Sequence, residues 1–101
     1  MFERKELSKD EVLLTVMGPL TGENTNEFHR QMEELTAASY STISLDLSHT
    51  NSINSSALGK ILMFKKKLAE TQRTLQIRGC SDTLLKTLQM IKFDALISLK
   101  K

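Results

Sequence analysis

The chain has 101 residues, 40% of them hydrophobic, which suits one compact domain spanning residues 1–101 and leaves no room for a second core. Its formal charge of +2 comes from 14 basic and 12 acidic residues scattered along the sequence, so it offers no strong field for nucleic acid or an anionic membrane. Cys80 is alone, which excludes an internal disulfide framework, and no apolar run approaches membrane-spanning length. We therefore expect a cytoplasmic domain that binds no nucleic acid and inserts into no membrane.

A hairpin and a helix are predicted for the N-terminal part. Apolar and polar residues alternate from Glu11 to Met17, which predicts a strand, and Phe2–Leu7 is expected to pair with it. Asn24, followed three residues later by Glu27, resembles a capping box. The pattern therefore predicts a helix from about Thr25 to Ala38. Its apolar face would hold Phe28, Met32 and Leu35.

Strands and helices alternate along the rest of the chain. Thr42–Leu47 and Arg73–Arg78 show the two-residue period of half-buried strands, with a helix predicted between them. Ser81 can cap a further helix that extends to Ile91, and Ala95–Leu99 is expected to be a last short strand. The predicted order is β, β, α, β, α, β, α, β. Because the strands alternate instead of being continuously apolar, we expect an α/β fold with a mixed sheet of four to five strands and helices mainly on one face.

The helix that follows Thr42–Leu47 has one apolar and one polar side. Ser55 is expected to be its N-cap and Ser56 its first helical residue. At 100° per residue, the core side holds Ala57, Leu58, Ile61, Leu62, Phe64, Leu68 and Ala69. The opposite side holds Ser56, Gly59, Lys60, Met63, Lys66 and Lys67. Met63 is an adaptable apolar side chain on an otherwise polar surface, so it can contact a partner.

The serines at the helix entrance are open to two interpretations. A hydroxyl there can cap the helix, or it can carry an anion near the positive end of the helix dipole. A triad of Asp46, His49 and Ser55 is disfavoured because the sequence has no G-x-S-x-G elbow. His29, His49 and Cys80 lack the paired spacing of metal ligands, and no glycine-rich phosphate loop is present. We therefore expect no enzyme, no catalytic residue, no metal site and no cofactor.

The residues N-S-S-A-L-G at positions 54–59 resemble the D-S-[ST]-G-L-G signature of STAS domains, specifically the bacterial anti-anti-sigma factors, also called anti-sigma factor antagonists. The order of elements fits that family over nearly the whole chain. The resemblance implies that Ser55, or as second choice Ser56, is phosphorylated by a partner that is both an anti-sigma factor and a serine kinase of the histidine-kinase-like ATPase type. It also implies that the unmodified form binds this partner, that phosphorylation releases it, and that a serine phosphatase takes part.

The resemblance and the helix pattern together define an expected partner-binding surface. Its residues are Thr21, Asn54, Ser55, Ser56, Gly59, Lys60, Met63 and Lys67. Three positions depart from the family pattern: Asn54 stands in place of Asp, Ala57 in place of Gly, and Thr21 in place of the acidic residue of a G-E-L-D turn. We expect a monomer that acts by binding. The alternative is a STAS subunit of a transporter or of a non-transcriptional signalling complex, for example in biofilm or lipid-trafficking regulation.

Overall fold

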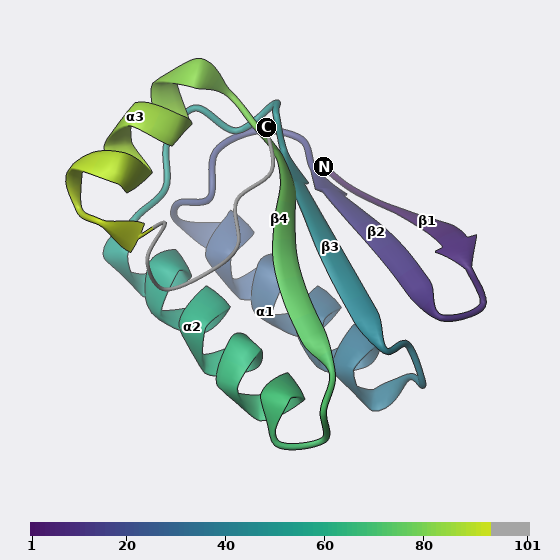
Figure 1. The fold of residues 1–101 in the computed structure, drawn as a ribbon. Helices are drawn as coiled ribbons and strands as arrows, with labels where there is room; N and C mark the ends of the chain where they lie inside the picture. The colour runs from purple at the N-terminus through teal and green to yellow at the C-terminus, as the bar shows by residue number, and fades with distance from the viewer. Residues whose placement is uncertain (94–101) are drawn as a thin grey trace.

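The computed structural model describes residues 1–93, which form four strands and three helices in the order β, β, α, β, α, β, α (Figure 1). The strands are β1 (Phe2–Ser8), β2 (Glu11–Val16), β3 (Thr42–Leu47) and β4 (Thr74–Cys80). The helices are α1 (Glu23–Ala37), α2 (Ser55–Ala69) and α3 (Asp82–Met90). The type and order of the predicted elements in this range are confirmed, and the predicted strand Ala95–Leu99 lies outside the described residues. None of the helices within residues 1–93 is long and apolar enough to cross a membrane.

The four strands form a mixed sheet in the order β1-β2-β3-β4. β1 and β2 make an antiparallel hairpin in which Phe2 faces Val16, whereas β2 with β3 and β3 with β4 are parallel pairs. A helix connects the two members of each parallel pair, because parallel strands need a crossover connection. The predicted mixed sheet is therefore confirmed.

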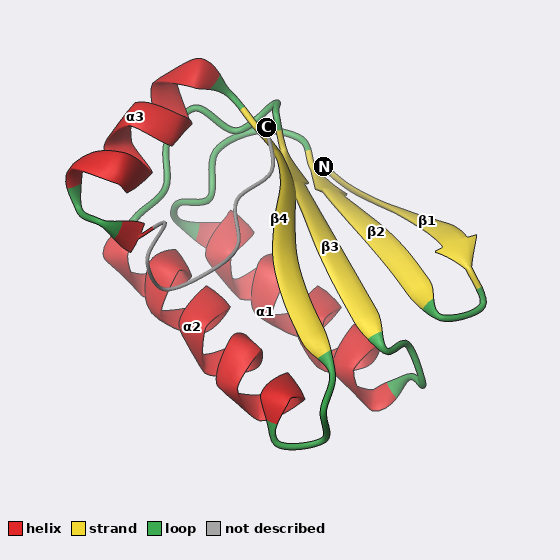
Figure 2. Ribbon diagram, in the orientation of Figure 1, coloured by secondary structure: helices red, strands yellow, loops and turns green. Residues whose placement is uncertain are grey.

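Alternation along the strands decides which face the helices cover. In β2, Val12, Leu14 and Val16 are buried, and the residues between them are partly exposed. α1 and α2 lie side by side against the buried face (Figure 2). To the core between sheet and helices, these two helices contribute Phe28, Met32, Leu35, Ala57, Ile61, Phe64 and Leu68. The prediction that helices lie mainly on one face is confirmed.

The opposite face of the sheet is polar and cross-linked by hydrogen bonds. The Ser44 hydroxyl of β3 donates to the Glu11 carboxylate of β2 at 2.7 Å, and the Gln76 amide of β4 donates to Ser44 at 3.0 Å. Arg78 donates to the same Glu11 carboxylate at 3.2 Å. Ser44 is fully buried, yet its hydroxyl both donates and accepts. Within residues 1–93, this face therefore satisfies its buried polar group without a second layer of helices.

α1 begins earlier than its sequence pattern indicates. Its N-cap is Gly22, at φ 56°, and no side chain caps this end. Asn24 lies inside the first turn, where its amide donates to the carbonyl of Pro19 at 2.9 Å. The predicted capping box at Asn24 is therefore wrong. The reason is that Gly22 adopts a positive φ that starts the helix sooner, and hydrophobic periodicity carries no trace of such a turn.

The C-terminal end of α1 is closed by a side chain that precedes β4. The guanidinium of Arg73 donates to the carbonyl oxygens of Thr36, Ala38 and Tyr40 at 2.9, 2.9 and 2.6 Å, and to that of Leu35 at 3.5 Å. The last carbonyl groups of a helix have no partner within it, so these bonds supply one. Arg73 thus fixes the end of α1 to the sheet.

Candidate functional site

Asn54 caps the N-terminus of α2. Its side-chain oxygen accepts a hydrogen bond from the N–H of Ala57 at 2.8 Å, and its backbone is extended at φ −95° and ψ 170°. Ser55 is therefore the first helical residue, and the prediction that Ser55 is the N-cap is wrong by one position. Asn and Ser are equally good caps, so the sequence pattern did not distinguish between them.

Ser55 and Ser56 are exposed in the first turn of α2. The N–H of Ala57 is bonded to the Asn54 side chain, and the N–H of Leu58 is bonded to the Asn54 carbonyl. Within residues 1–93, the structure gives no acceptor to the N–H groups of Ser55 and Ser56. Both hydroxyls thus lie beside free donors at the positive end of a 15-residue helix, where added negative charge is favoured. Neither serine is occupied as a cap, because Asn54 fills that position.

Thr21 lies beside Asn54 because the two loops that carry them are hydrogen-bonded to each other. The N–H of Leu20 donates to the carbonyl of Ser52 at 2.9 Å, and the N–H of Asn54 donates to the carbonyl of Leu20 at 3.1 Å. Leu20 and Ile53 form an isolated parallel bridge, with Leu20 fully buried. The bridge brings Thr21, from the loop before α1, to the entrance of α2.

The loop between β3 and α2 is also held by two hydroxyl groups. The buried Thr50 donates to the carbonyl of Val16 at 3.2 Å. Ser81 accepts from the N–H of Leu84 as the N-cap of α3, which confirms that prediction, and its hydroxyl donates to the carbonyl of Thr50 at 2.8 Å. The loop is therefore fixed between β2 and α3. Sequence reasoning missed Thr50, whose only signal is a hydroxyl residue shortly after an apolar strand.

The predicted partner-binding surface, called the docking surface below, consists of Thr21, Asn54, Ser55, Ser56, Gly59, Lys60, Met63 and Lys67. Its residues on α2 lie mainly on the side of the helix that faces away from the sheet. Ser56, Gly59, Met63 and Lys67 are exposed, with Met63 at 44% of its maximum. A Cβ added to Gly59 would meet no atom within 4 Å. On the core side, the predicted residues are buried or partly buried except Ala69, which is exposed because it ends the last turn. The predicted orientation of α2 is otherwise confirmed.

Lys60 lies differently from the other α2 residues of the docking surface. It is half-buried, and its ammonium nitrogen lies 3.3 Å from Nδ1 of His29 on α1. The other ring nitrogen of His29 lies 3.5 Å from the carboxylate of Glu33. The imidazole also packs against Phe64, with ring centroids 5.3 Å apart. Lys60 therefore bridges α2 to α1 in this structure.

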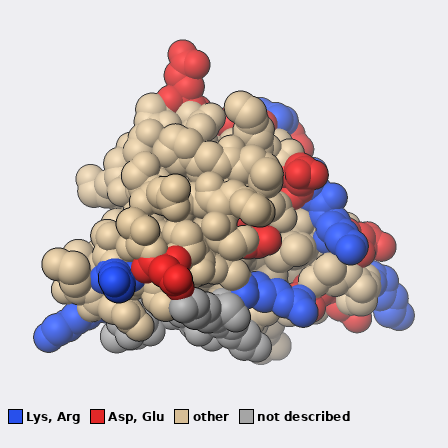
Figure 3. Space-filling view, turned by 90° about the horizontal axis from the view of Figure 1, so that it is seen from above, with Lys and Arg blue, Asp and Glu red and all other residues tan. Residues whose placement is uncertain are grey.

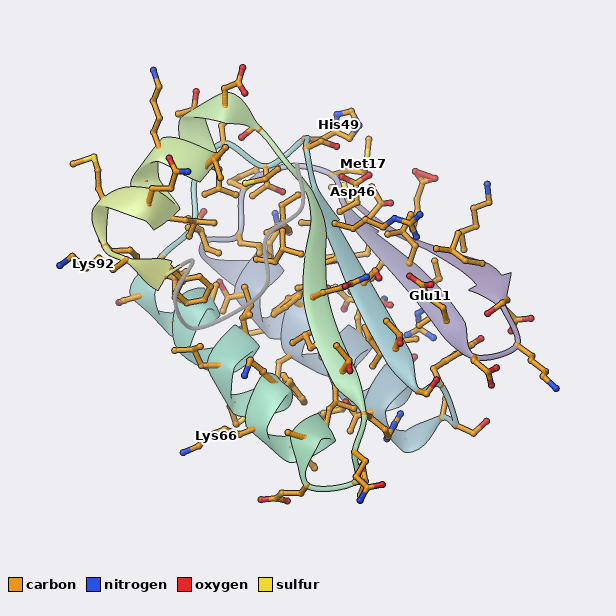
Figure 4. All side chains as sticks on the ribbon, in the orientation of Figure 1. Glu11, Met17, Asp46, His49, Lys66 and Lys92 are labelled. Carbon is orange, nitrogen blue, oxygen red and sulfur yellow. The ribbon has the colours of Figure 1, made fainter. Side chains whose placement is uncertain are left out.

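The loops around the entrance of α2 carry no formal charge. Segments 17–22 and 48–59 contain no Lys, Arg, Asp or Glu. Figure 3 shows the molecule from above, where a large part of the face is uncharged and most charged side chains lie toward its margins. Within α2 the first lysine is Lys60, and the side chain of Lys66 projects outward from the helix (Figure 4). The docking surface thus combines an uncharged entrance with a basic helix.

The alternative sites weighed from the sequence are not brought together. The Asp46 carboxylate accepts hydrogen bonds from the N–H and hydroxyl of Ser48 at 3.0 and 2.5 Å. Within residues 1–93, no hydrogen bond joins His49 to this carboxylate, as a triad would require. Within residues 1–93, no three His, Cys, Asp or Glu side chains are grouped to hold a metal ion. A depression of about 250 Å³ lies on the sheet face opposite α2, lined by Leu13, Asp46, Ser48, Arg78 and Gly79.

The four-stranded mixed sheet, the single helix layer and the serine-bearing start of α2 define a STAS domain. Residues 3–98 match the family model described as "Mlab, STAS domain". The chain therefore belongs to this STAS-domain family. None of the curated proteins matches its sequence.

Solved structures with the same fold include anti-sigma factor antagonists. SpoIIAA in its unphosphorylated form has a TM-score of 0.82 and 15% identity, over 100% of this chain and 89% of that chain. An anti-sigma factor antagonist from Mycobacterium paratuberculosis has a TM-score of 0.86 and 13% identity, over 99% and 84% of the two chains. The protein TM1081 of Thermotoga maritima has a TM-score of 0.87 and 24% identity, over 99% and 86%. These likenesses show a SpoIIAA-like STAS fold.

Proposed function

We propose that this protein is a regulatory binding protein of the anti-sigma factor antagonist type, switched by phosphorylation of Ser55. The unmodified form binds a partner protein through the docking surface, and the phosphorylated form releases it. One observation carries the proposal: Ser55 is exposed at the start of α2 while Asn54 performs the capping. The Ser55 hydroxyl is therefore open to modification without loss of the helix cap. Ser56, which shares this exposure, is the second choice.

The proposed switch acts on the partner. A phosphate on Ser55 would add about −1.5 to −2 charges at a helix end that favours negative charge, so the domain should stay folded. The same phosphate would add bulk and charge to an entrance that is otherwise uncharged. A partner surface fitted closely to Thr21, Asn54 and Gly59 would lose that fit.

The proposed partner is an anti-sigma factor with serine-kinase activity of the histidine-kinase-like ATPase type, and a serine phosphatase would restore the unmodified form. The shared fold supports this proposal, since SpoIIAA is known in an unphosphorylated form and SpoIIAA of Bacillus in a phosphorylated form. The protein would act in the cytoplasm as a monomeric single domain without catalysis of its own.

A second function is favoured by the uncharged pair at the entrance. Thr21 and Asn54, which lie side by side, both stand where the family pattern has acids. A partner that requires those charges would bind this chain poorly. The same surface would then serve a transporter or a non-transcriptional signalling complex, with the protein as its STAS subunit.

Affinity purification of four forms, followed by mass spectrometry for partners and phosphosites, tests the proposal. The forms are wild type, Ser55→Ala, Ser55→Asp and the matched control Ser39→Asp, which places the same charge on an exposed serine after α1. We expect wild type, Ser55→Ala and Ser39→Asp to retain the partner and Ser55→Asp to lose it. Equal recovery in all four forms would refute the switch. An ATPase of a transporter among the retained proteins, with Ser55 unmodified, would support the second function.

A further inference from the structure

Lys60 connects the docking surface to α1 through a single histidine. Its Nζ lies 3.3 Å from Nδ1 of His29, whose Nε2 lies 3.5 Å from Glu33. Within the described residues, the charged groups against the imidazole are thus Lys60 from α2 and Glu33 from α1 itself. Phe64, the third contact, is an uncharged ring.

The contact between Lys60 and His29 requires a neutral imidazole. An ammonium group has only donors, so Nδ1 of His29 must offer its lone pair. The ring proton then lies on Nε2, on the side of the Glu33 carboxylate. Each neighbour of the ring is compatible with this one tautomer.

We propose that protonation of His29 releases Lys60 from α1 to the docking surface. A second ring proton on Nδ1 would place one donor against another and one positive charge against another, which removes the attraction. Glu33 beside Nε2 would hold the imidazolium in place, so the lysine moves. Its flexible stem lies next to Gly59, which has no side chain to obstruct it.

The consequence is a docking surface that gains a mobile cation when His29 is protonated. As regulation of docking, this inference rests on the proposed function. The release of Lys60 itself can be measured on the protein alone. If no partner bound, the release of Lys60 could still be observed. If Lys60 were not released, partner binding could still be observed.

NMR spectroscopy between pH 8 and pH 5.5 tests the release. At pH 8 we expect the Nε2–H tautomer of His29 and a nuclear Overhauser effect between the ε-methylene of Lys60 and the imidazole ring. At pH 5.5 we expect that effect to be lost and the Lys60 side chain to become as mobile as that of the exposed Lys66.

Two variants provide the controls, because the chain has two histidines. His29→Gln should abolish the pH dependence of Lys60 mobility, whereas His49→Gln, in the β3–α2 loop, should preserve it. Backbone amide spectra show whether each variant is folded. An Overhauser effect that survives protonation of His29, or Lys60 mobility that still depends on pH in His29→Gln, would overturn the inference.

Discussion

Replacement of Gly59 by alanine should stabilise the fold and weaken partner binding. Gly59 lies inside α2, where glycine is about 0.5–1 kcal/mol less favourable than alanine. The added Cβ meets no atom within 4 Å, so no steric cost offsets this gain. We expect a rise of about 0.5–1 kcal/mol in the free energy of unfolding, or about 2–8 °C in Tm for a chain of this size. The new methyl group would stand on the docking surface and hinder close approach.

At two other glycines, replacement by alanine should lower the free energy of unfolding instead of raising it. Gly22 has φ 56°, and an alanine held there would cost about 1–3 kcal/mol in backbone strain. At Gly79 an added Cβ would lie 2.6 Å from the Asp46 carboxylate oxygen, and such overpacking costs about 1–3 kcal/mol. The three variants add the same methyl group, so their differences report the local structure.

Urea unfolding followed by far-ultraviolet circular dichroism measures all three variants, and a binding assay with the purified partner follows for Gly59→Ala. Because this variant should be more stable than wild type, a loss of binding cannot be attributed to unfolding. Gly59→Ala that is less stable than wild type would refute the structural reasoning. Gly59→Ala that is more stable and binds normally would refute close approach at Gly59.

Three further predictions concern the caps and the acid stability. Asn54→Ala should lower the free energy of unfolding by about 1 kcal/mol in urea titrations, because the N–H of Ala57 loses its acceptor; no change would mean that Asn54 is not the cap. Arg73→Ala should lower the free energy of unfolding by at least about 1.5–3 kcal/mol, the range for one hydrogen bond to a charged group, since it removes four. Hydrogen bonds from Arg30, and then from Gln31, lower the pKa of Glu27 from 4.5 to about 2. The stabilisation from Glu27 is therefore present above pH 4.5 and lost as the pH falls through about 2, so Glu27→Gln should be less stable than wild type at pH 6, with the difference disappearing below pH 2.

Patterns that depend on burial were readable from the sequence. The alternation in Thr42–Leu47 and the apolar arc of α2 both arise because these elements pack against one core. They therefore predicted the sheet, the helix layer and the exposed side of α2. Met63 was placed correctly for the same reason. The same pattern placed the serines at the start of that helix, and the resemblance of a short signature to a known family added the expectation that one of them is phosphorylated.

Features that depend on the approach of distant segments were not readable. The contact of Lys60 with His29 exists only because α1 and α2 pack side by side. The proximity of Thr21 and Asn54 depends on the bridge between Leu20 and Ile53. The predicted N-cap of α2 was wrong for a different reason, because Asn and Ser side chains can accept from the same N–H groups.

The cap at Asn54 separates two properties that an aspartate would combine. Its amide oxygen accepts from Ala57 as a carboxylate would, so α2 starts at the same residue with or without a charge. The negative charge is the property that is absent, and Thr21 beside it is uncharged as well. A phosphate on Ser55 would therefore meet free N–H groups and no neighbouring carboxylate among the loop residues 17–22 and 48–54. The fold should thus tolerate modification of Ser55 readily, and under the proposed function we expect selectivity among partners to come from the shape and the lysines of α2.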